Sequence, residues 1–173
     1  NHDNKENMQK VIGCPMNTVQ YESGNWRVIG LDTAVADEDY GFISTEEIIN
    51  LELQLINNPD LWFVIFMHHH PVNIGSEWID KYKLRNGDAL LKMIYHHKNV
   101  KAIFNGHVHQ SWKCTLNKID IYSTPSTWLQ FQKESDTCIP DLSGPAFRSI
   151  KLNANGTLNT DVFVCNFQGS QYG

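Results

Sequence analysis

The chain has 173 residues, of which 41% are hydrophobic and 19% are charged; this composition indicates one globular domain and excludes a disordered or fibrous protein. The formal net charge of -5 at pH 7, with no run of Lys or Arg, argues against a nucleic-acid polymer as a partner, because a phosphate backbone is bound by a basic surface. The longest apolar stretch, residues 61–67, is far shorter than the ~18 residues of a membrane span, so we expect no membrane association.

The first half of the chain is predicted to alternate strands and helices. Residues 25–33 (NWRVIGLDT) form an apolar and β-branched run that predicts a strand. Ser44 and Glu47 have the spacing of a capping box, at the start of a helix that should end near residues 57–59. Residues 61–67 (LWFVIFM) are apolar without interruption, as in a strand that is buried on both faces of a sheet.

The same alternation continues to residue 104 and then gives way to antiparallel strands. A polar loop with Trp78 precedes a helix expected from about residue 86 to 97, and residues 100–104 predict a further strand. Two pairs of short strands follow, at 111–116 with 119–123 and at 147–152 with 158–164. The turns between them are Asn117-Lys118 and Asn155-Gly156, and the latter is typical of a two-residue hairpin loop.

Histidines follow two of the predicted strands directly: His68, His69, His70, His107 and His109. In open α/β sheets, ligands bind at the carboxyl ends of the strands. A lone histidine is more often a surface residue or a satisfied core residue, and we interpret His96 and His97, late in a helix, in this way. Three consecutive imidazoles after a buried strand are costly to bury without partners, so we expect a metal at this loop.

A metal site is also indicated by the segment Gly106-His107-Val108-His109. If it is extended, residues two apart point to the same side, and the two imidazoles can ligate one metal or two adjacent metals. The preceding glycine would allow a close approach of the backbone to the site.

These motifs resemble those of the calcineurin-like metallophosphoesterases, and in particular the bacterial class III cyclic-nucleotide phosphodiesterases. The resemblance extends from His2 to about Cys165, and its motifs are N-H-D, M-H-H-H-P-V-N-I-G-S-E-W-I-D, G-H-V-H-Q and S-T-P-S-T-W-L-Q-F. It implies an α/β fold, the carboxyl-terminal part of a four-layer α-β-β-α sandwich with mixed sheets.

The resemblance also implies a role for each candidate residue. Asn1, His68 and His107 would ligate one metal of a binuclear site, and His109 would ligate the other. His2 would face the phosphate as the catalytic acid, with Asp3 orienting its ring. Within the triplet, His68 is the favoured ligand and His69 comes next, with substrate binding as its expected role.

Members of this family carry D-x-H and G-D-x-x-D motifs before G-N-H-D, and the sequence contains neither. We therefore expect residues 1–173 to be a single partial domain, with one bound metal or none in the isolated chain. Strands whose sheet continues elsewhere leave apolar surface uncovered, so marginal stability or self-association as a homo-oligomer is also expected.

The resemblance implies metal-dependent hydrolysis of a phosphodiester, most specifically 3′,5′-cyclic AMP to 5′-AMP by the full-length parent. Two divalent transition metals, Mn, Fe or Zn, would clamp the phosphate. The alternatives are a broader phosphodiesterase or phosphomonoesterase of the same fold, and a non-catalytic folded fragment that binds one metal. The four widely spaced cysteines suggest free thiols and a cytoplasmic location.

Overall fold

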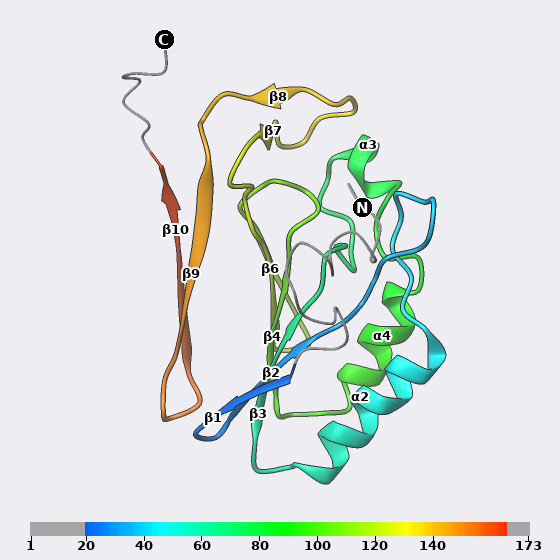
Figure 1. The fold of residues 1–173 in the computed structure, drawn as a ribbon, viewed down its shortest axis with the longest axis vertical. Coiled ribbons are helices and arrows are strands. Elements are labelled where there is room, and N and C mark those ends of the chain that lie inside the picture. The colour runs from blue at the N-terminus through cyan, green and yellow to red at the C-terminus, as the bar shows by residue number, and fades with distance from the viewer. Residues whose placement is uncertain (1–19, 166–173) are drawn as a thin grey trace.

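The computed structural model describes residues 20–165 (Figure 1), and these form three sheets and three helices. The helices are α2 (Thr45–Asn57), α3 (Glu77–Asp80) and α4 (Gly87–Ile94). The strands are β1 (Gln20–Ser23), β2 (Trp26–Gly30), β3 (Trp62–Phe66), β4 (Val100–Asn105), β5 (Trp112–Leu116), β6 (Ile119–Ser123), β7 (Gln130–Phe131), β8 (Pro140–Asp141), β9 (Ala146–Leu152) and β10 (Leu158–Val164).

The main sheet is six-stranded and mixed, in the order β1-β2-β3-β4-β6-β5. Strands β2, β3, β4 and β6 are parallel neighbours, whereas β1 and β5 pair antiparallel at the two edges. The strands predicted at 25–33, 61–67 and 100–104 are therefore confirmed, and their carboxyl ends lie along one edge of the sheet.

Each face of this sheet is covered by a different layer (Figure 1). On one face α2 and α4 pack against alternate residues of β3, including Phe63 and Ile65, in the larger apolar core. On the other face the β9–β10 hairpin packs against Val64, through Ile150 and other partly buried apolar residues. The uninterrupted apolar sequence of β3 is thus explained by burial on both faces, as predicted.

The capping box predicted for α2 forms only in part. Ser44 Oγ accepts a hydrogen bond from Glu47 N at 3.1 Å, as an N-cap should. The Glu47 carboxylate accepts a hydrogen bond from Asp32 N at 2.9 Å, so this side chain fastens the start of α2 to the end of β2. The start of α2 and the end of β2 are thereby held together near the edge of the sheet at which the strands end.

One predicted boundary was wrong. Helix α4 ends at Ile94 instead of His97, because the N–H groups of His96 and His97 donate to carbonyls three residues back and the chain turns toward β4. The strands predicted at 147–152 and 158–164 are confirmed by β9 and β10, but their connection is a five-residue loop, 153–157, and not a two-residue turn. A hydrogen bond from Asn153 N to Thr157 O at 2.9 Å closes this loop.

Three short elements, α3, β1 and the β7–β8 pair, were not predicted from the sequence. They have only two to four residues in each segment, which is too short for a periodic pattern. In residues 20–165, no helix has the length and apolar character needed to cross a membrane.

Candidate metal centre

The histidine motifs meet because β3 and β4 are parallel neighbours in register. Phe66 pairs with Phe104, so the residues that follow each strand emerge side by side. The carbonyl of His68 accepts hydrogen bonds from Gly106 N at 3.1 Å and from His107 N at 3.0 Å. The backbone therefore joins the two strand ends at the point where the candidate ligands begin.

His68 and His107 present ring nitrogens to each other. His68 Nε2 lies 3.2 Å from His107 Nδ1. Two imidazole nitrogens bound to one ion at about 2.0–2.1 Å lie roughly 2.9–3.4 Å apart in octahedral or tetrahedral geometry, so the observed pair fits a shared divalent metal. Together with His69, these residues offer nitrogens within 4.8 Å of one another, and we call the three the histidine cluster.

The electrostatics of the cluster favour neutral imidazoles, the form that binds metals. Burial, together with the neighbouring His68, His69 and His70, lowers the pKa of His107 to about 2. Burial also lowers the pKa of His69 to about 4, although the hydrogen bond to the Asp39 carbonyl opposes this shift. At neutral pH a metal does not have to displace a proton from these rings.

His69 is the most deeply held member of the cluster. Its side chain is 1% exposed, and both of its ring nitrogens have partners within the protein. Nδ1 lies 2.8 Å from Thr33 Oγ1, and Nε2 lies 3.0 Å from the carbonyl oxygen of Asp39. This arrangement does not favour the substrate-binding role that the resemblance implied for His69.

His70 also has an internal partner. Its ring is buried, and Nε2 lies 3.1 Å from Asp80 Oδ1, which also accepts a hydrogen bond from Ile74 N. Burial lowers the pKa of His70 to about 4 against the opposing effect of the Asp80 carboxylate. His70 thus fixes the loop that follows β3 to α3.

His109 is held apart from the histidine cluster by a turn. The N–H of His109 donates to the carbonyl of Gly106 at 3.1 Å, and His109 itself has a φ of 50°. The expectation that this segment is extended was therefore wrong. At Gly106, the nearest atom of the described residues to an added Cβ would be His68 Nδ1 at 3.9 Å.

The ring of His109 is nevertheless oriented by two contacts. Nδ1 donates to the carbonyl of Leu129 at 2.8 Å, and the ring stacks on Phe131 with centroids 4.9 Å apart. A proton held on Nδ1 makes Nε2 the nitrogen with the lone pair, which is the usual way in which a protein prepares a histidine to bind a metal. This geometry suits a ligand to an ion other than the one between His68 and His107.

Other candidate residues, Asn1, His2 and Asp3, lie outside the described residues. The structure adds three residues that the sequence analysis missed: Thr33, Asp39 and Asp80. Thr33 and Asp39 come from the loop before α2, 36 and 30 residues from His69, and no motif in the sequence marks them. Asp80 ends α3, 10 residues from His70, and lies within a motif of the resemblance, but the sequence does not show its contact with His70.

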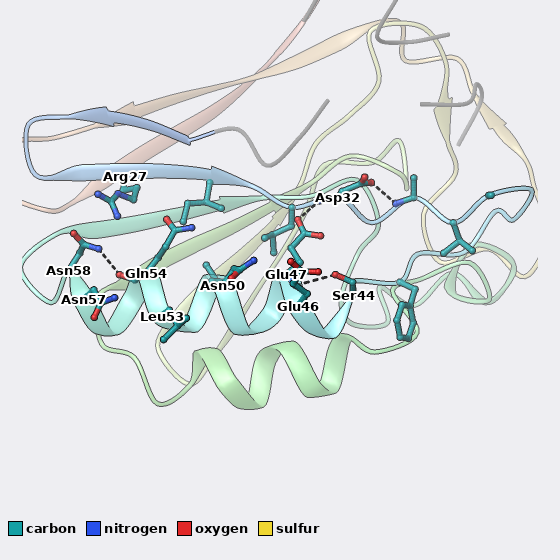
Figure 2. A pocket seen from close by; sticks show the side chains of 17 residues that line it. Arg27, Asp32, Ser44, Glu46, Glu47, Asn50, Leu53, Gln54, Asn57 and Asn58 are labelled. Atoms are coloured by element: carbon teal, nitrogen blue, oxygen red, sulfur yellow. Dashed lines mark hydrogen bonds between the residues drawn. The ribbon is translucent and has the colours of Figure 1, made fainter. Parts of the chain in front are cut away.

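A groove of about 1000 Å³ lies elsewhere, between α2, β2 and the loop that joins them (Figure 2). We call it the α2–β2 groove. Arg27, Asp32, Asn50 and Gln54 are among its lining side chains, and no histidine of the described chain lines it. Its chemistry does not suit a transition-metal site, so the histidine cluster is the candidate centre.

Comparison with known proteins identifies relatives that are named as cyclic-nucleotide phosphodiesterases. The chain is 34% identical to the 3′,5′-cyclic adenosine monophosphate phosphodiesterase CpdA of Vibrio vulnificus, over 99% of this chain and 66% of the relative. It is 35% identical to a 3′,5′-cyclic-nucleotide phosphodiesterase of Nostoc sp., over 94% of this chain and 62% of the relative. These cyclic-nucleotide phosphodiesterases are therefore homologues of the chain. No family model matches it.

The solved structures agree on the fold. A dimetal phosphatase from Danio rerio superposes with a TM-score of 0.52 at 14% identity, over 62% of this chain and 48% of that one. GAP50, the anchor in the inner membrane complex of Plasmodium, superposes with a TM-score of 0.54 at 14% identity, over 90% of this chain and 51% of that one. The predicted α/β metallophosphoesterase fold with a mixed sheet is thus confirmed.

The chain spans about 60–66% of the length of four curated relatives. The alignments with these relatives cover more than nine tenths of the chain itself. The homologues support a hydrolase family, while the activity of the whole protein is a matter for proposal.

Proposed function

We propose that the whole protein containing this chain is a metal-dependent phosphodiesterase that converts 3′,5′-cyclic AMP into 5′-AMP. The observation that carries the proposal is the 3.2 Å separation of His68 Nε2 and His107 Nδ1 at adjoining strand ends. The names of the relatives support the substrate, since they are cyclic-nucleotide phosphodiesterases.

In this proposal His68 and His107 hold one divalent metal, and His109 holds a second through Nε2. Asn1 completes the shell of the first metal, as the family resemblance implies. Bound ions of this kind neutralise phosphate charge and generate a hydroxide nucleophile at neutral pH. A nitrogen and oxygen donor set is compatible with Mn, Fe or Zn.

The chain's own residues prepare that site in three ways. The carbonyl of Leu129 fixes the tautomer of His109, and the carbonyl of His68 ties β3 to β4. Burial keeps His107 neutral, with a lowered pKa. His2 would protonate the leaving oxygen of the phosphodiester, and Asp3 would orient the His2 ring.

The test is an assay of the whole protein with cyclic AMP and added Mn²⁺. We expect 5′-AMP to accumulate without further hydrolysis, and we expect chelation to abolish turnover and Mn²⁺ to restore it. Turnover that persists after complete removal of metal would overturn the proposal. Release of inorganic phosphate from 5′-AMP at a comparable rate would favour the broader phosphomonoesterase instead.

A variant series in the same protein locates the chemistry. Replacing His2 with Ala should leave the metal content unchanged and lower turnover by about 10²–10⁴, the usual contribution of one general acid or base. His96→Ala is the matched control, since this histidine is exposed beyond the end of α4. Loss of metal from the His2 variant would assign His2 as a ligand.

A further inference from the structure

The loop between β6 and β7, residues 124–129, carries an aromatic side chain that the fold leaves uncovered. Trp128 is 75% exposed, and of the large apolar side chains in the described chain only Leu142 is more exposed. Trp128 belongs to none of the apolar clusters that the described residues form. Since large aromatic rings contribute chiefly to cores and to contacts with other molecules, its surface is available for a contact of the second kind.

The backbone of this loop is nevertheless held by buried hydrogen bonds. Gln130, which is 5% exposed, accepts a hydrogen bond from Ser126 N at 2.9 Å and donates to the carbonyl of Gly144 at 3.0 Å. The carbonyl of Ser126 accepts a hydrogen bond from Ala146 N at 2.8 Å, and its hydroxyl accepts one from Trp128 N at 3.1 Å. The exposed indole is therefore carried by a fixed backbone, which lowers the cost of ordering it when a ligand binds.

The same loop contacts the candidate metal centre. The carbonyl of Leu129 accepts the hydrogen bond from His109 Nδ1 at 2.8 Å, and Phe131 N donates to the carbonyl of His109 at 3.4 Å. Because neighbouring Cα atoms are only about 3.8 Å apart, Trp128 lies directly beside the residue that orients His109. Trp128 is thus placed at the rim of the site at which His109 would hold a metal.

The other aromatic rings next to His109 are already in contact with one another. Phe131 stacks on His109 with centroids 4.9 Å apart, and Trp78 of α3 meets Phe131 in a T-shaped arrangement with centroids 4.8 Å apart. Both rings are partly buried, so they support His109 from within the protein. Trp128, in contrast, offers its aromatic surface to solvent beside the same site.

The chemistry of the proposed substrate matches such a ring. In a 3′,5′-cyclic nucleotide the base is attached to the ribose that carries the cyclic phosphate, so a phosphate bound at the metal centre brings the base to the rim of the site. Nucleobases stack on aromatic side chains through their π faces, without a specific pattern of hydrogen bonds. A purine presents two fused rings to an indole, whereas a pyrimidine presents one.

We propose that Trp128 stacks on the purine base of the cyclic nucleotide and thereby contributes to a preference for purine substrates. This inference rests on the proposed function, because the phosphate that places the base is the one bound at that site. The indole contacts the base and not the reacting phosphate. Its loss therefore raises KM more than it lowers kcat.

The experiment compares two substrates of the whole protein loaded with Mn²⁺. One is cyclic AMP, and the other is methyl ribofuranoside 3′,5′-cyclic phosphate, which has the same cyclic phosphodiester and no base. Trp128→Ala should lower kcat/KM for cyclic AMP by about 5–150-fold, the range for stacking of one base, and leave kcat/KM for the base-free substrate unchanged. Trp128→Phe retains an aromatic face and should recover most of the loss.

A matched control and a second readout accompany these variants. Leu142→Ala removes another large side chain, 91% exposed, from the connection between β8 and β9, and should change neither substrate. The ratio of kcat/KM for cyclic AMP to that for cyclic CMP should fall in Trp128→Ala, because the purine loses more stacking than the pyrimidine. Circular dichroism and elemental analysis establish that each variant keeps its fold and its metal.

The outcomes separate the two proposals. If the wild-type protein hydrolyses neither cyclic phosphate, the proposed function fails and this inference fails with it. If the wild type hydrolyses cyclic AMP and Trp128→Ala does so with the same kcat/KM, the stacking role alone is overturned. An equal loss on cyclic AMP and on the base-free substrate would show that Trp128 acts on the metal centre through its neighbour Leu129, and would likewise overturn it.

Discussion

The histidine cluster and the α2–β2 groove are two regions of the described chain in which polar side chains gather, and they are built differently. The cluster lies where two parallel strands end, with His69 and His107 buried. The groove is wide, and apolar side chains at its rim, such as Phe42 and Leu53, are 46% and 50% exposed. The α2–β2 groove is therefore notable for its volume, and the histidine cluster is notable for its metal-binding side chains.

The difference lies in how much of each arrangement is fixed by the fold. In the cluster, strand register and buried hydrogen bonds hold the rings, and burial lowers the pKa of His107. Such convergence of buried, perturbed groups at one place is a feature of functional sites. The groove offers a volume of about 1000 Å³, and no histidine of the described residues lines it.

The largest effect that we expect tests whether the cluster is the metal site. Replacing His68 and His107 together with Ala removes both nitrogens of the close pair. Metal affinity should fall by more than about 100-fold, beyond the loss caused by an orienting partner. Equilibrium dialysis with Mn²⁺ measures it, with Leu53→Ala in the groove as control. If the double variant binds as much metal as the wild type, the histidine cluster is not the metal site.

A smaller effect is expected for His109, because its turn holds it apart from the cluster. If the whole protein binds two ions, His109→Ala should lose one and keep the other, which His68 and His107 retain. Elemental analysis after gel filtration gives the ratio of metal to protein. Loss of both ions together would show that the two positions form one cooperative site.

The pH dependence of stability should also distinguish the buried histidines from exposed ones. Folding lowers the pKa values of His69 and His70 from 6.5 to about 4, so the unfolded chain binds more protons between these values. The free energy of unfolding should therefore be highest above pH 6.5 and fall as the pH drops toward 4. Urea unfolding at pH 7, 6 and 5 measures this.

A control variant sharpens that measurement. His70→Asn removes one buried titrating group, so the fall between pH 7 and 5 should be shallower than in the wild type, whatever the variant's absolute stability. Leu53→Ala, which removes no titratable group, should leave the slope unchanged. Equal slopes in the wild type and the His70 variant would mean that His70 is not held neutral by folding.

The fold was largely predictable because its central strands carry strong patterns. The apolar run at residues 61–67 and the Ser44 cap predicted β3 and the start of α2. The positions of His68 and His107 at neighbouring strand ends followed from the parallel alternation. The Gly106–His109 turn did not, because a left-handed residue in a four-residue segment leaves no periodic signal.

The hydrogen-bond partners of the histidines could not be predicted from the sequence, for a different reason. Thr33 and Asp39 meet His69 only because the β2–α2 loop folds back across the strand ends. In the sequence, His69 and His68 are adjacent and identical in type, whereas in the structure one ring is enclosed by hydrogen bonds and the other meets His107. Tertiary contacts alone give the two rings different surroundings.

The smallest effect on the metal site is expected from substitutions on the exposed face of α2. These substitutions test whether the chain self-associates. Ile49, Leu53 and Ile56 of α2 are 50%, 50% and 56% exposed. Replacing them with Asp, Asp and Lys should leave metal affinity unchanged. Each exposed substitution should alter the free energy of unfolding by only about 0.5 kcal/mol. If this surface mediates the predicted association, sedimentation across a concentration series will show a dimer in the wild-type chain and a monomer in the triple variant. A wild-type chain that remains monomeric, with a melt independent of concentration, would contradict the expected homo-oligomer and leave these side chains as isolated surface residues.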